Sequence, residues 1–390
     1  MIQHSNSGST LAIFCKVVDN FGDIGICWRL ARQFHAEHGI KVTLWVDDLK
    51  SFQRIWPAVD THADVQQVEG VTVRHWDGQD GVFTPADVAD IVIEFFGVDI
   101  PPGYIEAMAR CEPRPVWINY EGLTAEEWVE GCHTLPSMHP RLKLTKHFFF
   151  PGFVADKTGG LLRERGLVES RAAFQADKQA QADFLRGLGV SMGEMGTLKV
   201  SLFCYPHAPV TELFEAWAQG DRPVTCLVPE GVARDKVAAF LGLDAADVHA
   251  GAHATRGRLS VRVIHFMHQD DYDRLLWACD LNFVRGEDSW VRAQWAGRPF
   301  VWHIYPQDEN LHHVKLRAFL QKYTGNPTSL VDFSLCWNGA GRNDEDWVAL
   351  WNALQADLPT ITRATSDWQA QMLANGDLVS NLLNFAQSLR

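Results

Sequence analysis

The stretch KVVDNFGDIG, residues 16–25, brings together two carboxylates, Asp19 and Asp23, and two glycines. The apolar run at 11–18 predicts a buried strand, and the apolar spacing at 24–38 predicts a helix. The two acids therefore lie where a strand leads into a helix, which is where open α/β sheets bind ligands. A helix N-terminus stabilises negative charge, so these acids are expected to stay ionised and able to act as general bases.

The same residues also have a purely structural interpretation. Asp19 or Asp23 can cap the helix, because a short carboxylate side chain accepts hydrogen bonds from the free N–H groups of the first turn. The glycines then only permit the turn. From these residues alone, capping and chemistry are equal alternatives.

A second polar cluster, with the sequence RGEDS, again joins a predicted strand to a predicted helix. Arg285 can hold a phosphate through two hydrogen bonds, and Gly286 allows the backbone to approach a ligand closely. The free N–H groups near Ser289 form an anion site at the helix N-terminus. Glu287 and Asp288 either hydrogen-bond sugar hydroxyls or act as solvated capping acids.

Aromatic side chains follow other strands of the second half. Phe203 and Tyr205 close its first predicted strand, and Phe266 and Gln269 close a later one. The rings can stack on a nucleobase whose edge Gln269 reads, and plain core packing is the alternative. Tyr305, in a polar loop further on, can reach a diphosphate.

Alternating strands and helices are expected to position these residues. In the first half, strands are predicted at 11–18, 42–46, 71–76, 91–95 and 116–119, and helices at 24–38, 102–111 and 125–131. In the second half, strands are predicted at 199–205, 224–228, 259–266, 280–284 and 299–302, and helices at 209–219, 232–241, 272–279, 287–296 and 311–323. This alternation is typical of doubly wound α/β domains.

Two domains are expected, because 390 residues exceed what one hydrophobic core supports. We predict an N-terminal Rossmann-like domain over 1–190 and a second over 191–364, after an aromatic- and glycine-rich break at 146–160 and a polar helix at 167–187. The tail is helical at 345–354 and 362–390. Packing of its last helix, about 365–390, against the first domain is compatible with this division.

Composition excludes several classes of protein. A net charge of −13 disfavours nucleic-acid binding, and no apolar run reaches the roughly 18 residues of a membrane span. The polar start has no secretory h-region, and the eight cysteines form no Cys-x-x-Cys pair, so a cytoplasmic protein with reduced thiols is expected. The first unit lacks a Gly-x-Gly-x-x-Gly fingerprint, the chain lacks a P-loop, and its histidine pairs lack the companions of a zinc site.

Three motifs together, DNFGDIG at 19–25, RGEDS at 285–289 and HIYPQ at 303–307, resemble the EarP family of protein-arginine rhamnosyltransferases. The resemblance spans essentially the whole chain. It implies the GT-B fold, with two Rossmann-like domains facing across a cleft and C-terminal helices. It also implies inverting transfer of L-rhamnose from dTDP-β-L-rhamnose to an arginine side-chain nitrogen of translation elongation factor P, with no metal or cofactor.

The resemblance also implies roles for individual residues. Asp19 is the general base, Asp23 its acidic partner and Glu287 a third essential carboxylate. The substrate-binding residues are then Asn20, Phe21, Gly22, Phe203, Tyr205, Phe266, Gln269, Arg285, Asp288, Ser289 and Tyr305. Within this set, the ring of Phe266 stacks on thymine.

Two other functions fit a chain of this layout. A nucleotide-sugar epimerase with the same two-domain fold would turn over its nucleotide sugar without a protein acceptor. A non-catalytic module would keep a degenerate nucleotide site and bind a partner protein.

Overall fold

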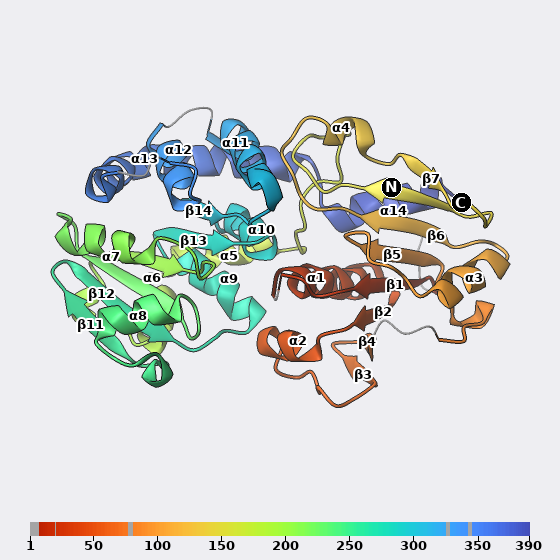
Figure 1. The fold of residues 1–390 in the computed structure, drawn as a ribbon, viewed down its shortest axis with the longest axis horizontal. Coiled ribbons are helices and arrows are strands. Elements are labelled where there is room, and N and C mark those ends of the chain that lie inside the picture. The colour runs from red at the N-terminus through yellow and green to blue at the C-terminus, as the bar shows by residue number, and fades with distance from the viewer. Residues whose placement is uncertain (1–7, 20, 77–80, 325–327, 342–344) are drawn as a thin grey trace. The chain divides into compact units, whose positions relative to one another are not determined.

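The computed structural model describes residues 8–19, 21–76, 81–324, 328–341 and 345–390. The chain forms two compact units, drawn in Figure 1. Unit 1 comprises Met1–Arg165 and Met372–Arg390, and unit 2 comprises Gly166–Gln371.

Unit 1 is built on an eight-stranded sheet of order β3-β4-β2-β1-β5-β6-β8-β7. Its interior strands pair in parallel, and the two edge strands β3 and β7 pair antiparallel to their neighbours. The strands are β1 (Thr10–Cys15), β2 (Lys41–Val46), β3 (Val65–Val68), β4 (Val71–His75), β5 (Ile91–Phe95), β6 (Val116–Tyr120), β7 (Pro136–Met138) and β8 (Thr145–Phe149). The five strands predicted for this half are therefore confirmed as β1, β2, β4, β5 and β6.

The helices of unit 1 pack on this sheet and on one another. They are α1 (Phe21–His38), α2 (Leu49–Ile55), η1 (Pro85–Asp87), α3 (Pro102–Arg110), α4 (Val129–Cys132) and α14 (Leu378–Ser388). The helix predicted at 125–131 is shorter than expected. The Thr124 hydroxyl contacts both the backbone N–H and the carboxylate of Glu126, a local alternative to helical hydrogen bonds.

Unit 2 is built on a six-stranded sheet of order β11-β12-β10-β9-β13-β14, in which only β11 runs antiparallel to its neighbour. Its strands are β9 (Leu198–Leu202), β10 (Val224–Pro229), β11 (His253–Arg256), β12 (Leu259–Ile264), β13 (Leu281–Arg285) and β14 (Phe300–His303). The helices are α5 (Leu167–Ala176), α6 (Lys178–Gly187), η2 (Met192–Glu194), α7 (Val210–Gln219), α8 (Arg234–Leu241), η3 (Ala245–Asp247), α9 (Gln269–Ala278), α10 (Asp288–Ala296), η4 (Asp308–Asn310), α11 (Leu311–Thr324), α12 (Thr328–Trp337) and α13 (Trp347–Ala374).

The helix predicted at 167–187 is in fact two helices. Asp177 leaves helical geometry at φ −84° and ψ 94° and caps α6, accepting hydrogen bonds from the N–H groups of Gln179 and Ala180. Both helices belong to unit 2. Leu185 and Val190 are buried in one apolar cluster with residues of β10 and α9, so the expected boundary between residues 190 and 191 lies inside unit 2.

The C-terminal segment of the chain returns to unit 1. Asp377 caps α14, and the Gln33 amide on α1 donates to its carboxylate at 3.2 Å. Asn381 of α14 donates to the carbonyl of Gly159, which joins the last helix to the loop after β8. Among the described residues, no helix combines the length and the apolar character that a membrane span requires.

Candidate functional site

The loop between β1 and α1 is closed by Asp23, in the first turn of the helix. Its Oδ2 atom accepts hydrogen bonds from the backbone N–H groups of Val18 at 2.7 Å and Asp19 at 2.8 Å. The N–H of Gly22 donates to the carbonyl of Asp19 at 2.7 Å. Because Asp23 is only 5% exposed and its Oδ2 atom accepts two N–H groups of the loop, it determines the path on which Asp19 lies.

The pKa of Asp23 is governed by its burial. Burial raises the pKa of this carboxyl above its usual value, and the charges of Asp19 and Asp47 add to the shift, against the two backbone hydrogen bonds. This shift is opposite in sign to the stabilisation of negative charge that a helix N-terminus provides. Loss of hydration outweighs the local dipole.

Asp19 is half-buried, and Gly22 lies directly against its carboxylate. A Cβ atom at position 22 would stand 2.9 Å from Oδ2 of Asp19, so any side chain there would displace the acid. Phe21 is also half-buried, with the Arg54 guanidinium 5.4 Å from its ring centroid. Asn20 lies outside the described residues.

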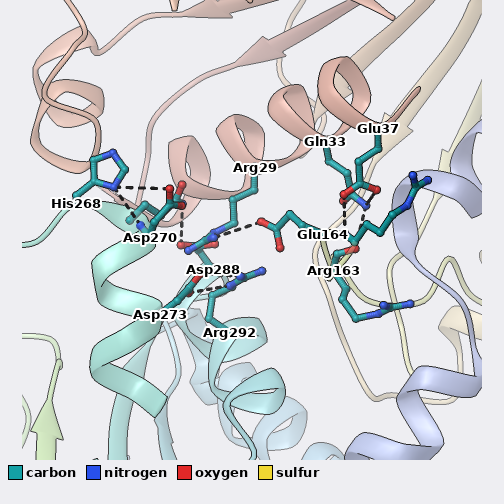
Figure 2. Close-up of polar contacts among 12 residues, drawn as sticks. Arg29, Gln33, Glu37, Arg163, Glu164, His268, Asp270, Asp273, Asp288 and Arg292 are labelled. Carbon is teal, nitrogen blue, oxygen red and sulfur yellow. Dashed lines mark hydrogen bonds and ion pairs between the residues drawn. The ribbon is translucent and has the colours of Figure 1, made fainter. Parts of the chain in front are cut away.

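The helix that follows this loop is held by polar contacts within unit 1 (Figure 2). The guanidinium of Arg29, 1% exposed, pairs with Glu164 at 3.3 Å. The amide of Gln33 donates to the carbonyl of Arg163 at 2.9 Å and to the carboxylate of Glu37 at 3.0 Å. These contacts keep α1 fixed behind the loop that carries Asp19.

In unit 2, the turn after β13 is closed by Ser289. The N–H of Arg285 donates to its hydroxyl at 2.9 Å, and the hydroxyl donates in turn to the carbonyl of Arg285. Gly286 adopts φ +61°, a left-handed conformation that favours glycine. Glu287 occupies the N-cap position of α10, but its side chain makes no capping hydrogen bond to that helix.

Arg285 is held by aromatic side chains that follow β9. Its guanidinium carbon lies 4.5 Å from the ring centroid of Phe203 and 4.8 Å from that of Tyr205. Its Nη1 donates to the carbonyl of Cys204 at 3.2 Å. A guanidinium stacked between two rings is fixed in direction while it remains partly exposed.

The structure brings the remaining predicted donor-side residues to the same part of unit 2. The ring centroids of Phe266 and Phe203 are 6.4 Å apart, and those of Tyr305 and Tyr205 are 5.7 Å apart. Gln269 does not close a strand as predicted. It begins α9, where His268 accepts the N–H of Asp270 as the cap, and its amide donates to Asp288 at 3.1 Å.

His303 was not assigned a role from the sequence, although it begins the HIYPQ motif. It is 1% exposed, and its Nδ1 accepts the N–H of Tyr205 at 3.2 Å. Burial holds its pKa well below the usual value, assisted by the nearby His207, Arg285, His312 and Lys236. A neutral imidazole that accepts at Nδ1 carries its proton on Nε2.

Lys236 was also missed by the sequence analysis. Its ammonium donates to the carbonyls of Pro206 at 3.0 Å and Ala208, so it braces the loop after β9 on which Tyr205 lies. Across the described residues, no three His, Cys, Asp or Glu side chains are grouped as a metal site would need.

A family model described as Elongation-Factor P (EF-P) rhamnosyltransferase EarP matches residues 11–387. The chain belongs to the EarP family. The sequence prediction of this family is therefore confirmed, and its three motifs lie at the β1–α1 turn, the β13–α10 turn and the end of β14.

Relatives in the family match over nearly the full length. A protein-arginine rhamnosyltransferase of Pseudomonas putida is 47% identical over 380 residues, covering 97% of this chain and 98% of the relative. One of Pseudomonas aeruginosa is 46% identical over 381 residues, covering 96% of this chain and 97% of the relative.

Comparison with solved structures identifies the fold. A structure concerned with EarP-mediated arginine glycosylation of translation elongation factor EF-P matches with a TM-score of 0.67 and 35% identity, covering 97% of this chain and 99% of that chain. A glycosyltransferase from Rickettsia africae, at 9% identity and a TM-score of 0.53, shares the fold alone. Two Rossmann-like units with C-terminal helices form the GT-B fold, which confirms the predicted fold class.

Proposed function

We propose that this chain is an inverting protein-arginine rhamnosyltransferase, which moves L-rhamnose from dTDP-β-L-rhamnose to an arginine side-chain nitrogen of translation elongation factor P. Membership of the EarP family and the names of the relatives support the reaction class. The observation that carries the assignment of the donor site is Arg285, stacked between Phe203 and Tyr205 beside the start of α10.

Unit 2 has the groups that a nucleoside diphosphate sugar needs. Arg285 and the N–H groups at the start of α10 offer charge and hydrogen bonds to the diphosphate, and Gly286 lets the phosphate approach the backbone. Phe266 offers a ring for stacking on thymine, and Gln269 an amide for its edge. Tyr305, 43% exposed, is open to the ligand.

The acceptor chemistry requires acids. A guanidinium is protonated at neutral pH, with a pKa above about 12, and its nitrogen lone pairs are delocalised. Asp19 orients the cation and takes a proton from the attacking nitrogen as the new N–C1 bond forms. The C1–O bond breaks on the opposite face of the sugar, and its electron pair leaves on the diphosphate, which Arg285 stabilises. Asp23 holds the Asp19 backbone in place, and Glu287 is the third acid.

The decisive experiment measures transfer from labelled dTDP-rhamnose to purified elongation factor P. We expect the label on one arginine of the acceptor, and its loss in Asp19→Asn. If the intact enzyme gives no labelled acceptor, the proposal is wrong. Turnover of the nucleotide sugar without acceptor would favour an epimerase, and the absence of both turnover and thermal stabilisation by dTDP would favour a binding module.

The compartment is part of the proposal. We place the reaction in the cytoplasm, because all eight cysteines are thiols and seven of them are buried. Reduced cysteines of this kind are typical of cytosolic proteins. Fractionation of cells with an antibody against the chain tests this location.

A further inference from the structure

We propose that Asp273 and Arg292 form a positioning pair for donor binding: their buried ion pair sets the register of α9 against α10 and thereby places Gln269 and Asp288. The inference rests on the proposed function, because it takes those two residues to belong to the donor site. Neither Asp273 nor Arg292 is expected to touch the donor itself.

The two helices are connected at matching positions. Gln269 and Asp288 are the first residues of α9 and α10, and their side chains are hydrogen-bonded at 3.1 Å. Asp273 and Arg292 each lie four positions further along. Arg292 donates from Nε to Oδ1 at 2.9 Å and from Nη2 to Oδ2 at 2.6 Å. Figure 2 shows this pair between the two helices.

A third connection lies at the other end of the same helices. The amide nitrogen of Gln175, on α5, donates to the carbonyl of Trp277 at 3.1 Å and to that of Ala296 at 3.0 Å. These carbonyls belong to the last turns of α9 and α10. The helices α9 and α10 are thus parallel neighbours, connected by polar contacts at the start, the middle and the end.

The middle connection is the one that fixes register most strictly. The side chains of Arg292 and Asp273 are 1% and 7% exposed, so the pair is desolvated. A buried ion pair contributes little net stability compared with apolar residues of the same size, because both charges lose their hydration. A two-bonded guanidinium–carboxylate contact does, however, permit only one geometry, whereas apolar side chains can slide past one another. The pair therefore suits a role in positioning.

The test compares Asp273→Asn and Arg292→Lys with the wild-type enzyme. We expect the KM for the nucleotide sugar to rise about tenfold, the size of effect when one good polar contact is lost, while the KM for the acceptor protein stays unchanged. Glu194→Gln is the matched control. It breaks a second ion pair of unit 2, Arg262–Glu194, in which Arg262 Nε lies 2.9 Å from each carboxylate oxygen. This control is expected to lower Tm without changing the KM for the donor.

Two further variants separate positioning from simple loss of stability. In a Gln269→Ala/Asp288→Ala background, Asp273→Asn is expected to raise the donor KM no further, because both residues that the pair positions have already lost their side chains. The apolar double variant Asp273→Leu/Arg292→Met is expected to keep Tm near that of the wild type and still raise the donor KM. It also provides the measurement if a single variant fails to fold.

The outcomes distinguish the inference from the function on which it rests. If Gln269→Ala raises the donor KM but Asp273→Asn and the apolar double variant do not, the pair is structural and the inference is overturned. If Gln269→Ala and Asp288→Ala leave donor binding unchanged, the proposed donor site itself is wrong. A further rise in the donor KM when Asp273→Asn is added to the Gln269→Ala/Asp288→Ala variant would likewise overturn the positioning role.

Discussion

The carboxylate of Asp23 accepts the backbone N–H of Asp19 at 2.8 Å, so one acid of the DNFGDIG motif holds the main chain of the other. Asp23 is buried and bound to the loop, whereas Asp19 is half-buried. The two acids are therefore not equivalent. The one suited to receive a proton from a substrate is Asp19, and the one suited to shape the loop is Asp23.

This relationship predicts different consequences for the two acids. Asp19→Asn is expected to lower kcat by about 10²–10⁴-fold, the range for loss of a general base, with Tm unchanged. Asp23→Ala leaves two backbone N–H groups without their acceptor, and it is expected to lower both activity and the free energy of unfolding, by about 1–3 kcal/mol. Rhamnose-transfer kinetics and thermal unfolding check both variants. An Asp23→Ala protein with unchanged Tm would contradict this division of roles.

Gly22→Ala is predicted to impair catalysis with little loss of stability. The added Cβ would stand 2.9 Å from Oδ2 of Asp19, and the carboxylate must move away from it. We expect a lower kcat, measured by the same transfer assay. Gly131→Ala is the control in unit 1, because a Cβ there meets no atom within 4 Å, and its kcat should match the wild type.

The pH dependence of stability should carry the signature of Asp23. Burial, first of all, raises its pKa above 3.8 in the folded protein, so the folded state binds more protons than the unfolded state just above that pH. Stability contributed at this site therefore falls as pH rises above 3.8, so the Tm difference between Asp23→Asn and the wild type should shift in favour of Asp23→Asn over that rise.

Asp48 provides a control, because its effect on stability is expected to depend on pH in the opposite direction. Burial raises its pKa, but hydrogen bonds from Ser51 and Lys50 outweigh that effect and lower it below 3.8. The stabilisation at this site is present above pH 3.8 and is lost as pH falls, so Asp48→Asn should be least harmful in acid. The same slope for the Asp23 and Asp48 variants would contradict the assignment. Thermal unfolding over a pH series measures both.

Arg285→Lys is predicted to weaken donor binding. Lysine is a point charge that cannot form the two parallel hydrogen bonds of a guanidinium and covers less of the two rings. We expect the donor KM to rise about tenfold or more. Arg256→Lys is the control. Its guanidinium lies 5.0 Å from the ring of Phe240, and its replacement should leave the donor KM unchanged.

Transfer is predicted to proceed without a divalent cation. Arg285 and the N–H groups at the start of α10 supply the charge stabilisation that the departing diphosphate needs. Incubation with EDTA, followed by assay in metal-free buffer, should leave kcat unchanged. A loss of activity that added Mg²⁺ or Mn²⁺ restores would contradict the prediction.

The sequence predicted the local elements well where their patterns were regular. The strands β1 and β5 are mostly apolar and buried on both faces, which is typical of parallel sheets. The sequence pattern did not predict β8, whose residues are polar or aromatic and of which only Phe149 is fully buried. It also merged α5 with α6 across Asp177. Short or edge elements carry weak periodicity, so tertiary pairing decides them.

In the candidate site, too, some residues were predicted from the sequence and others became evident only in the structure. Asp19, Arg285 and Ser289 were predicted as site residues because each lies at a strand-to-helix turn that the sequence marks with glycine and acid. The roles of His303 and Lys236 were not visible. Each acts on the loop after β9 from a distant part of the chain, and nothing local in the sequence indicates such a contact.

By itself, the sequence determined the family, the two α/β halves and the turns at which polar residues gather, because strands, helices and turns depend mainly on neighbouring residues. Only the tertiary structure decided that Asp23 is bound to the Asp19 backbone and that Arg285 stacks on two rings. It alone decided that Asp273 meets Arg292. These contacts depend on burial and on the packing of elements distant in sequence, which set both the geometry of a side chain and the pKa of its ionisable group.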